Sequence, residues 1–287
     1  MSIVKALMIG DVVGDPGLAV LEARLPDLIR ENKADFAVVN GENAAEGFGL
    51  TKETLDRILA AGADVVTSGN HIWEKRDFWP VLESERRVLR PGNYPEEASG
   101  RGWVSIQKAD ITWLVLNLQG REYMTPIDCP FKNSDNTLKN RGRPVTETHP
   151  LLSPEGELSA FAAGLTGIGG IVLVDFHAES TREKEALAYY LDGRVSLLAG
   201  THTHVQTADE RILPKGTAYI TDLGMTGVSD SIIGMDPKIC LDRARNQVLY
   251  RMECAKAGPD GSGSAIQGVI AEIDRDTGRA VSIKRIS

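Results

Sequence analysis

Short apolar runs rich in β-branched residues alternate with amphipathic segments along this chain, and that alternation limits which folds it can adopt. Strands are predicted at residues 3–9, 36–39, 65–67, 111–116, 171–175, 195–199, 218–221 and 268–273. Helices are predicted at residues 18–31, 52–61, 75–83 and 182–191. Several strand segments are almost continuously apolar, which is typical of strands buried on both faces of a sheet. The alternation therefore predicts a layered α/β fold with a mostly parallel sheet.

One stretch breaks the alternation. From about residue 133 to residue 170 the chain is rich in Gly, Pro, Ser, Thr and Asn, and it contains His149. Such composition is typical of loops, so we predict a polar surface insertion there and interpret His149 as an exposed loop residue. With 287 residues, the whole chain is predicted to form one domain, residues 1–287, that carries this insertion.

Charge and cysteine content exclude several classes of protein. The net charge is −8 and the isoelectric point is about 5.3, which disfavours broad, non-specific binding to nucleic acid. Cys129, Cys240 and Cys254 are widely spaced, so we expect free thiols rather than a disulfide framework or a zinc finger. No segment has the length of a membrane span or a signal peptide, and we expect a cytoplasmic protein with no membrane partner.

Polar residues that can bind metal follow five of the predicted strands. They occur in the sequences Gly10-Asp11, Asn40-Gly41-Glu42-Asn43, Gly69-Asn70-His71, Asp175-Phe176-His177-Ala178-Glu179 and Gly200-Thr201-His202-Thr203-His204. The carboxyl ends of parallel strands share one edge of a sheet, so these side chains should converge in space. Carboxylates, carboxamide oxygens and imidazoles suit Mn, Fe and Zn. The combination predicts a metal site.

Each of these short motifs is weak by itself. Gly-Asp after a strand is usually a turn, and Gly-Asn-His is equally often a turn with a hydrogen-bonded histidine. His-Thr-His at a strand end is stronger, because two histidines that are two residues apart can reach one centre. The chain lacks a phosphate-binding GxxxxGK[ST] loop and a GxSxG elbow, and its GLTGIGG precedes a strand instead of opening a helix. The metal prediction therefore depends on the motifs occurring together.

Longer motifs point to a known family. They are GDVVG, NGENAAEGFG, SGNHIW, RPGNYP, DCPF, DFHAEST, GTHTHVQTADERILPKGTAYITDLGMTG and GMD. Together they resemble the calcineurin-like metallophosphoesterase superfamily, and within it the YmdB-like branch, over nearly the whole chain. The superfamily usually has Asp-x-His at the first strand end. This chain has Asp11-Val12-Val13, a departure that the branch shares.

The resemblance implies a four-layer αββα sandwich and two divalent metal ions, Mn or Fe. Carried over by position, the roles are as follows: Asp11, Glu42 and His204 hold the first metal; Glu42 bridges to the second, which Asn70, His177 and His202 complete; Asn43 contacts the phosphate; His71 is the general acid. The resemblance also implies a small phosphodiester substrate, such as a 2′,3′-cyclic nucleotide or an RNA end, and a homo-oligomeric state.

Two metals could share a bridging hydroxide that attacks phosphorus in line, and both would hold the phosphate oxygens. His71 would protonate the leaving oxygen. This expectation describes a phosphodiesterase. A phosphomonoesterase or nucleotidase could use the same ligands. So could a metal-dependent regulatory protein with little turnover, although a regulator would not need an acid beside Asn70. A di-metal amidohydrolase fits less well, because its paired histidines usually come from the first strand.

Overall fold

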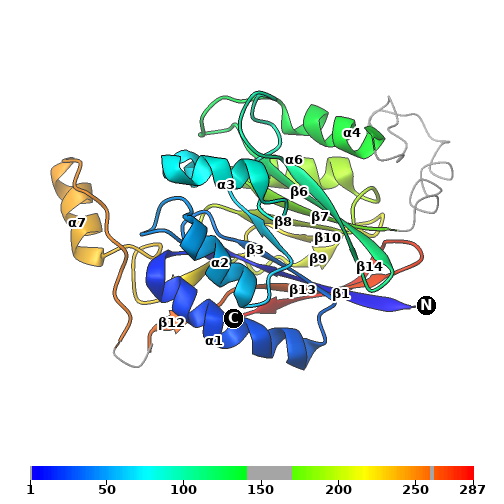
Figure 1. The fold of residues 1–287 in the computed structure, drawn as a ribbon, viewed down its shortest axis with the longest axis horizontal. Helices are drawn as coiled ribbons and strands as arrows, with labels where there is room; N and C mark the ends of the chain where they lie inside the picture. The colour runs from blue at the N-terminus through cyan, green and yellow to red at the C-terminus, as the bar shows by residue number, and fades with distance from the viewer. Residues whose placement is uncertain (1, 141–169, 259–261) are drawn as a thin grey trace.

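Two β-sheets packed face to face form the centre of the molecule, and helices cover their outer faces (Figure 1). The computed structural model describes residues 2–140, 170–258 and 262–287. The first sheet has the order β14-β13-β1-β3-β4 and the second β5-β6-β7-β8-β10-β9, while a small third sheet has the order β12-β11-β2.

The two large sheets are mixed, with parallel strands at their centres and antiparallel pairs toward three of their four edges. In the first sheet, β1, β3 and β4 run parallel, β13 is antiparallel to β1, and β14 is antiparallel to β13. In the second, β6, β7, β8 and β10 run parallel, with β5 and β9 antiparallel at the two edges. The strand bounds are β1 Ile3–Ile9, β2 Asp11–Val12, β3 Phe36–Asn40, β4 Val65–Thr67, β5 Trp103–Lys108, β6 Ile111–Gln119, β7 Gly170–His177, β8 Leu197–Thr201, β9 Arg211–Ile212, β10 Ala218–Ile220, β11 Met225–Val228, β12 Ser264–Ala265, β13 Gly268–Asp274 and β14 Ala280–Ile286.

Three clusters of buried hydrophobic side chains define four layers. The central cluster joins the inner faces of the two sheets, and there Phe36 of β3 stacks on Trp113 of β6 with ring centroids 4.7 Å apart. A second cluster packs α1, α2 and α3 against the first sheet, and a third packs α4 and α6 against the second. The helix bounds are α1 Gly14–Asn32, α2 Lys52–Ala60, α3 Trp79–Ser84, α4 Pro130–Asn140, α6 Thr181–Leu191 and α7 Pro237–Asn246, with 3₁₀ turns η1 Asn70–Trp73 and η2 Arg76–Phe78. The predicted αββα sandwich is confirmed.

The expected elements largely match. All eight predicted strands are present, although β8 begins and ends two residues later than expected. The helix predicted at residues 75–83 is divided into η2 and α3. Pro80 explains this division, because a residue without an N–H is tolerated in the first turn of a helix but not in its interior.

The polar stretch predicted near residues 133–170 requires a correction at its start. Residues up to Asn140 belong to helix α4, where Ser134, Thr137 and Leu138 are buried and Leu138 packs in the cluster formed by the second sheet and α6. The buried face of this helix contains serine and threonine, so its sequence lacks the apolar pattern that predicts a helix. Residues 141–169, and with them His149, lie outside the described residues.

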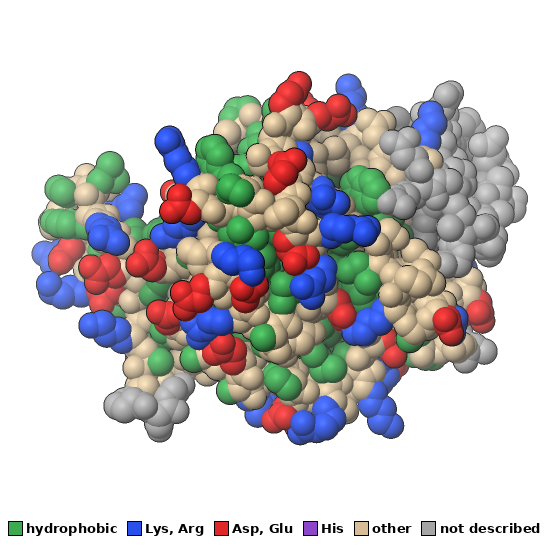
Figure 2. All heavy atoms as spheres, in the orientation of Figure 1, with side chains coloured by type: hydrophobic (Ala, Val, Ile, Leu, Met, Phe, Trp, Pro, Cys, Tyr) green, Lys and Arg blue, Asp and Glu red, His purple; other side chains and the backbone are tan. Residues whose placement is uncertain are grey.

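Helix α7 was not predicted, and it stands away from the layers (Figure 1). None of its residues is buried. On the face shown in Figure 2, acidic and basic side chains are interspersed over the body, and hydrophobic side chains are exposed around α7. In the part of the chain that the structure describes, no helix is both long and apolar enough for a bilayer crossing.

Candidate metal centre

All eight predicted site residues lie at the same edge of the two packed sheets. Asp11 begins β2, and a single residue separates it from the end of β1. The first sheet contributes Glu42 and Asn43 from the loop after β3, and Asn70 and His71 from η1 after β4. The second sheet contributes His177, the last residue of β7, and the loop after β8 contributes His202 and His204. The site therefore spans the junction between the two sheets.

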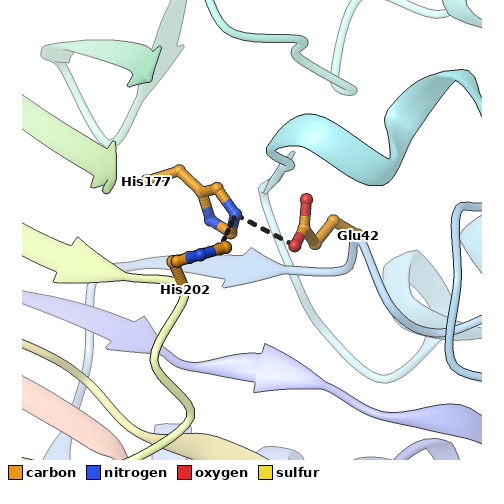
Figure 3. A group of neighbouring side chains, drawn as sticks. All are labelled: Glu42, His177 and His202. Atoms are coloured by element: carbon orange, nitrogen blue, oxygen red, sulfur yellow. Dashed lines mark hydrogen bonds and ion pairs between the residues drawn. The ribbon is translucent and has the colours of Figure 1, made fainter. Parts of the chain in front are cut away.

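The tightest group is formed by one carboxylate and two imidazoles (Figure 3). Their ligand atoms all lie within 4.8 Å of one another. Nε2 of His177 is 3.0 Å from Oε1 of Glu42 and 3.0 Å from Nδ1 of His202. Because β7 and β8 belong to the second sheet and the loop after β3 belongs to the first, this group assembles only when the two sheets pack together.

The amide of Asn70 also faces His177. Its Oδ1 lies 3.1 Å from His177 Nε2, the same nitrogen that Glu42 and His202 approach. A ring nitrogen carries either one hydrogen or one lone pair, so it cannot form a good hydrogen bond to all three groups at once. A cation among these atoms would use all four donors, which are of the types that bind transition metals.

Asp11 lies beside this group. The backbone N–H of His202 donates to its Oδ2 at 3.1 Å, while its Oδ1 is 3.9 Å from His177 Nδ1. Among the described residues, Oδ1 has no hydrogen-bond partner although Asp11 is fully buried. An orphaned buried carboxylate oxygen is costly, and a bound cation would remove that cost.

His204 and Asn43 form the other side of the site. The Nδ1–H of His204 can donate to the carbonyl of Ile233 at 2.8 Å, which leaves the Nε2 lone pair facing Asn43 Nδ2 at 3.1 Å. The same Asn43 amide is 3.3 Å from Oε1 of Glu42. The histidine thus presents Nε2 to the site, the nitrogen that a metal ligand would use.

His71 differs from the other histidines. Its backbone N–H donates to Oε2 of Glu42 at 3.2 Å, but its ring packs edge-on against Phe48 and lies near the Glu74 carboxylate, 3.5 Å from Nδ1. The side chain is 28% exposed, whereas that of His177 is fully buried. It is therefore placed beside the ligand group at the solvent side.

Burial and mutual charge shift the pKa values of the ligand group. Burial raises the pKa of Asp11 to about 7, against the attraction of His204 and His177. Burial also acts to raise the pKa of Glu42, but the charge and hydrogen bond of His177 hold it at about 2. Burial acts to lower the pKa of His177, but the charge and hydrogen bond of Glu42 outweigh burial and raise that pKa to about 9. Burial, followed by repulsion from His177, lowers the pKa of His202 to about 3.

These shifts describe a site built around buried negative charge. The directions of these pKa shifts favour a protonated His177 beside the Glu42 carboxylate and a neutral His202 that can offer a lone pair. A divalent cation could take the place of that proton, because carboxylate and neutral imidazole are the forms that ligate metals. Together with the orphaned Asp11 oxygen, the donor set fits a metal centre.

Local backbone geometry brings the ligands together. A Cβ on Gly69 would lie 2.1 Å from Cδ2 of His177 and 2.4 Å from Oε2 of Glu42, so only glycine fits there. His202 and His204 have φ values of 101° and 63°, a region that side-chain-bearing residues rarely adopt. Between them, the Thr203 N–H donates to Asp222 at 3.1 Å.

A buried ion pair lies beneath this histidine loop. Nζ of Lys184 on α6 is 2.7 Å from Oδ2 of Asp222, and both side chains are essentially inaccessible. The Asp222 carboxylate also accepts the N–H of Gly224 at 2.9 Å. The pair therefore anchors the loop that carries His202 and His204 in its strained conformation.

Three further residues near the site had no predicted role. Glu179 lies 3.1 Å from Nε2 of His202. Asp175 and Thr201 are buried directly below His177. One signal was available: Asp175 and His177 are two residues apart on a strand, so their side chains point to the same face.

Comparison with known proteins gives a consistent result. The sequence model of a family described as YmdB-like protein matches residues 7–286. The chain is 41% identical over 282 residues to a 2′,3′-cyclic-nucleotide 2′-phosphodiesterase from Bacillus subtilis, covering 98% of this chain and 96% of that protein. A solved structure described as a novel phosphatase from Mycoplasma pneumoniae is 30% identical with a TM-score of 0.83, covering 100% and 93% of the two chains. A hypothetical protein from Thermus thermophilus is 36% identical with a TM-score of 0.80, covering 98% of both.

Proposed function

The chain belongs to the YmdB-like family, and from that membership and the site geometry we propose that it is a metal-dependent phosphodiesterase that cleaves 2′,3′-cyclic nucleotides and related RNA ends. The observation that carries the proposal is the convergence of all eight predicted residues in a chain that is 41% identical to the Bacillus subtilis enzyme over 98% of its length. Fold alone would not suffice, since one fold hosts many activities.

We propose that the centre holds two divalent ions, Mn or Fe. Asp11, Glu42 and His204 would hold the first, and Asn70, His177 and His202 would hold the second, with Glu42 shared. Metals in such a site supply charge neutralisation for the phosphate and lower the pKa of water to generate a nucleophile. The two oxygens of Glu42 face different neighbours, His177 and the His71 backbone, which suits a shared carboxylate.

The chain's own residues would do the remaining work. The amide of Asn43 lies between Glu42 and His204, where it can donate a hydrogen bond to a phosphate oxygen. His71 stands at the solvent side and is free of the ligand group, so it can give a proton to the departing ribose oxygen. Phe48 and Glu74 restrict the orientation of its ring.

We further propose that the chain acts in the cytoplasm as a homo-oligomer. The oligomer is supported by α7, a ten-residue helix without buried residues. Helices shorter than about 12–15 residues are marginal alone in water, so α7 would gain order from a partner surface. Around it, Ile233, Leu241 and Leu249 are 48%, 54% and 83% exposed.

A phosphomonoesterase is the competing function, and the Mycoplasma pneumoniae structure described as a phosphatase favours it. The charges of the site favour the diesterase. The predicted site residues include no arginine that would neutralise the additional charge of a monoester, whereas a diester carries one charge fewer.

The deciding measurement compares kcat/KM for 2′,3′-cyclic AMP with the values for 3′-AMP and 5′-AMP, at one pH and with one metal. The proposal predicts a clear preference for the cyclic diester. A preference for either monoester would establish the phosphatase instead. Equal and barely detectable rates on all three would contradict both enzymatic functions and favour a regulatory protein.

A further inference from the structure

A buried carboxylate that belongs to neither the predicted ligands nor the catalytic groups lies under the site. Asp175 of β7 is fully buried and accepts hydrogen bonds from three side chains. Thr201 Oγ1 donates to its Oδ1 at 2.6 Å, and Thr67 Oγ1 and Asn40 Nδ2 donate to its Oδ2 at 2.5 and 2.9 Å. Burial raises the pKa of Asp175, and these three bonds act against that rise.

Each donor comes from a different strand next to the site. Asn40 ends β3 and Thr67 ends β4 in the first sheet, while Thr201 ends β8 in the second. Asp175 itself is on β7, so a single carboxylate ties together strand ends from both sheets. These bonds satisfy the buried carboxylate and at the same time link the strand ends that carry the site.

The Thr201 hydroxyl connects this carboxylate to His177. A hydroxyl has one hydrogen, and Thr201 gives it to Asp175. Toward His177 Nδ1, which is 3.0 Å away, the Thr201 oxygen must then accept, so the hydrogen is on Nδ1. Asp11 Oδ1, at 3.9 Å, is too distant to compete. The other nitrogen, Nε2, is thereby directed to Glu42, Asn70 and His202 as the ligand atom.

The Asn40 amide connects the same carboxylate to the other side of the centre. Its Nδ2 donates to Asp175, and its Oδ1 accepts the backbone N–H of Glu42 at 3.1 Å. The backbone of the proposed shared ligand is thus held by the network that orients His177. Outer-sphere partners of this kind fix ring orientation and raise ligand basicity in metal sites.

We propose that Asp175 is a positioning residue of the metal centre. Acting through Thr201, it sets the hydrogen of His177 on Nδ1 and keeps Nε2 for the metal. Through Asn40 it also holds Glu42 at its distance from His177. The inference rests on the proposed metal centre, but it concerns metal affinity and needs no assumption about the substrate.

The test is calorimetric titration of metal-free protein with Mn²⁺. Thr201→Val keeps the shape of the side chain and removes the hydroxyl, and it should weaken Mn²⁺ binding about 10–100-fold. Thr201→Ser keeps the hydroxyl and should restore binding close to that of the wild type. Asp175→Asn should weaken binding as well, and the double variant Asp175→Asn with Thr201→Val should add little, because the two residues act in series.

Thr217→Val is the matched control. Thr217 is also fully buried, and its hydroxyl donates to Val195 O at 2.8 Å and accepts the Gly193 N–H at 2.9 Å, but it precedes β10 at the opposite end of the sheet. It should lower thermal stability without changing Mn²⁺ affinity. Wild-type affinity in Thr201→Val, or failure of serine to rescue it, would overturn the positioning role. No Mn²⁺ binding by the wild type would instead contradict the proposed metal centre itself.

Discussion

At the scale of single residues, four histidines share one edge of the sheets but meet different neighbours. The ligand atoms of His177 and His202 lie within 4.8 Å of that of Glu42, and His204 faces Asn43. His71 contacts Phe48 and the Glu74 carboxylate instead. These surroundings distinguish three proposed ligands from one proposed acid. The spacing of the histidines in the sequence does not make that distinction.

His71→Ala and His202→Ala should therefore differ. We expect His71→Ala to lower turnover about 10²-fold or more while metal content stays at the wild-type level, because only proton donation is lost. His202→Ala should lose both metal and activity. Elemental analysis and kcat for a diester with a poor leaving group measure the difference. Full activity in His71→Ala would contradict the acid role, and loss of metal in that variant would make His71 a ligand.

The eight site residues could be predicted from the sequence, because each follows a recognisable strand and the strand ends share one edge. The roles of Thr201 and Lys184 could not, and for Asp175 the sequence offered only its position two residues before His177 on a strand. Their importance lies in contacts between residues that are far apart in the sequence, such as Lys184 with Asp222 and Asp175 with Asn40. A buried lysine on an amphipathic helix looks the same in sequence as a solvated one.

At the scale of elements, apolar strands and capped helices were predictable. Helix α2 begins at Lys52, where Thr51 caps the N–H of Thr54 at 3.2 Å and the Thr54 hydroxyl accepts the Thr51 N–H at 2.9 Å, so threonine replaces the usual acid of the capping box. Helices α4 and α7 were missed because their residues are mostly polar. Contacts with α6 explain α4, whereas α7 has no comparable packing surface in the described part of the chain.

The proposed oligomer makes α7 the element to change. Leu241→Asp places a charge on its exposed apolar surface and should lower the mass measured by light scattering toward that of one 31.1 kDa chain. Tyr123→Asp is the control, since Tyr123 is 86% exposed but lies outside the α7 segment. A single-chain mass for the wild type would contradict self-association, and an unchanged oligomer in Leu241→Asp would exclude α7 as its contact.

At the scale of the whole molecule, the site depends on the packing of two sheets. The central hydrophobic cluster fixes their relative position, and Asp175 and the proposed ligands join their strand ends at one edge. The layered class followed from the alternation of strands and helices. The alternation does not show which strands belong to which sheet, because side-chain packing decides that assignment. The proposed centre therefore forms only when both sheets are in place.

The central claim is that this centre needs two metal ions for phosphodiester cleavage. Metal-free protein is titrated with Mn²⁺, and hydrolysis of 2′,3′-cyclic AMP is measured at each ratio of metal to chain. Two ions sharing Glu42 predict that the rate increases mainly as the second equivalent binds and saturates at two. In Glu42→Ala the rate should remain near background. Saturation at one equivalent, or a rate independent of added Mn²⁺, would contradict the account.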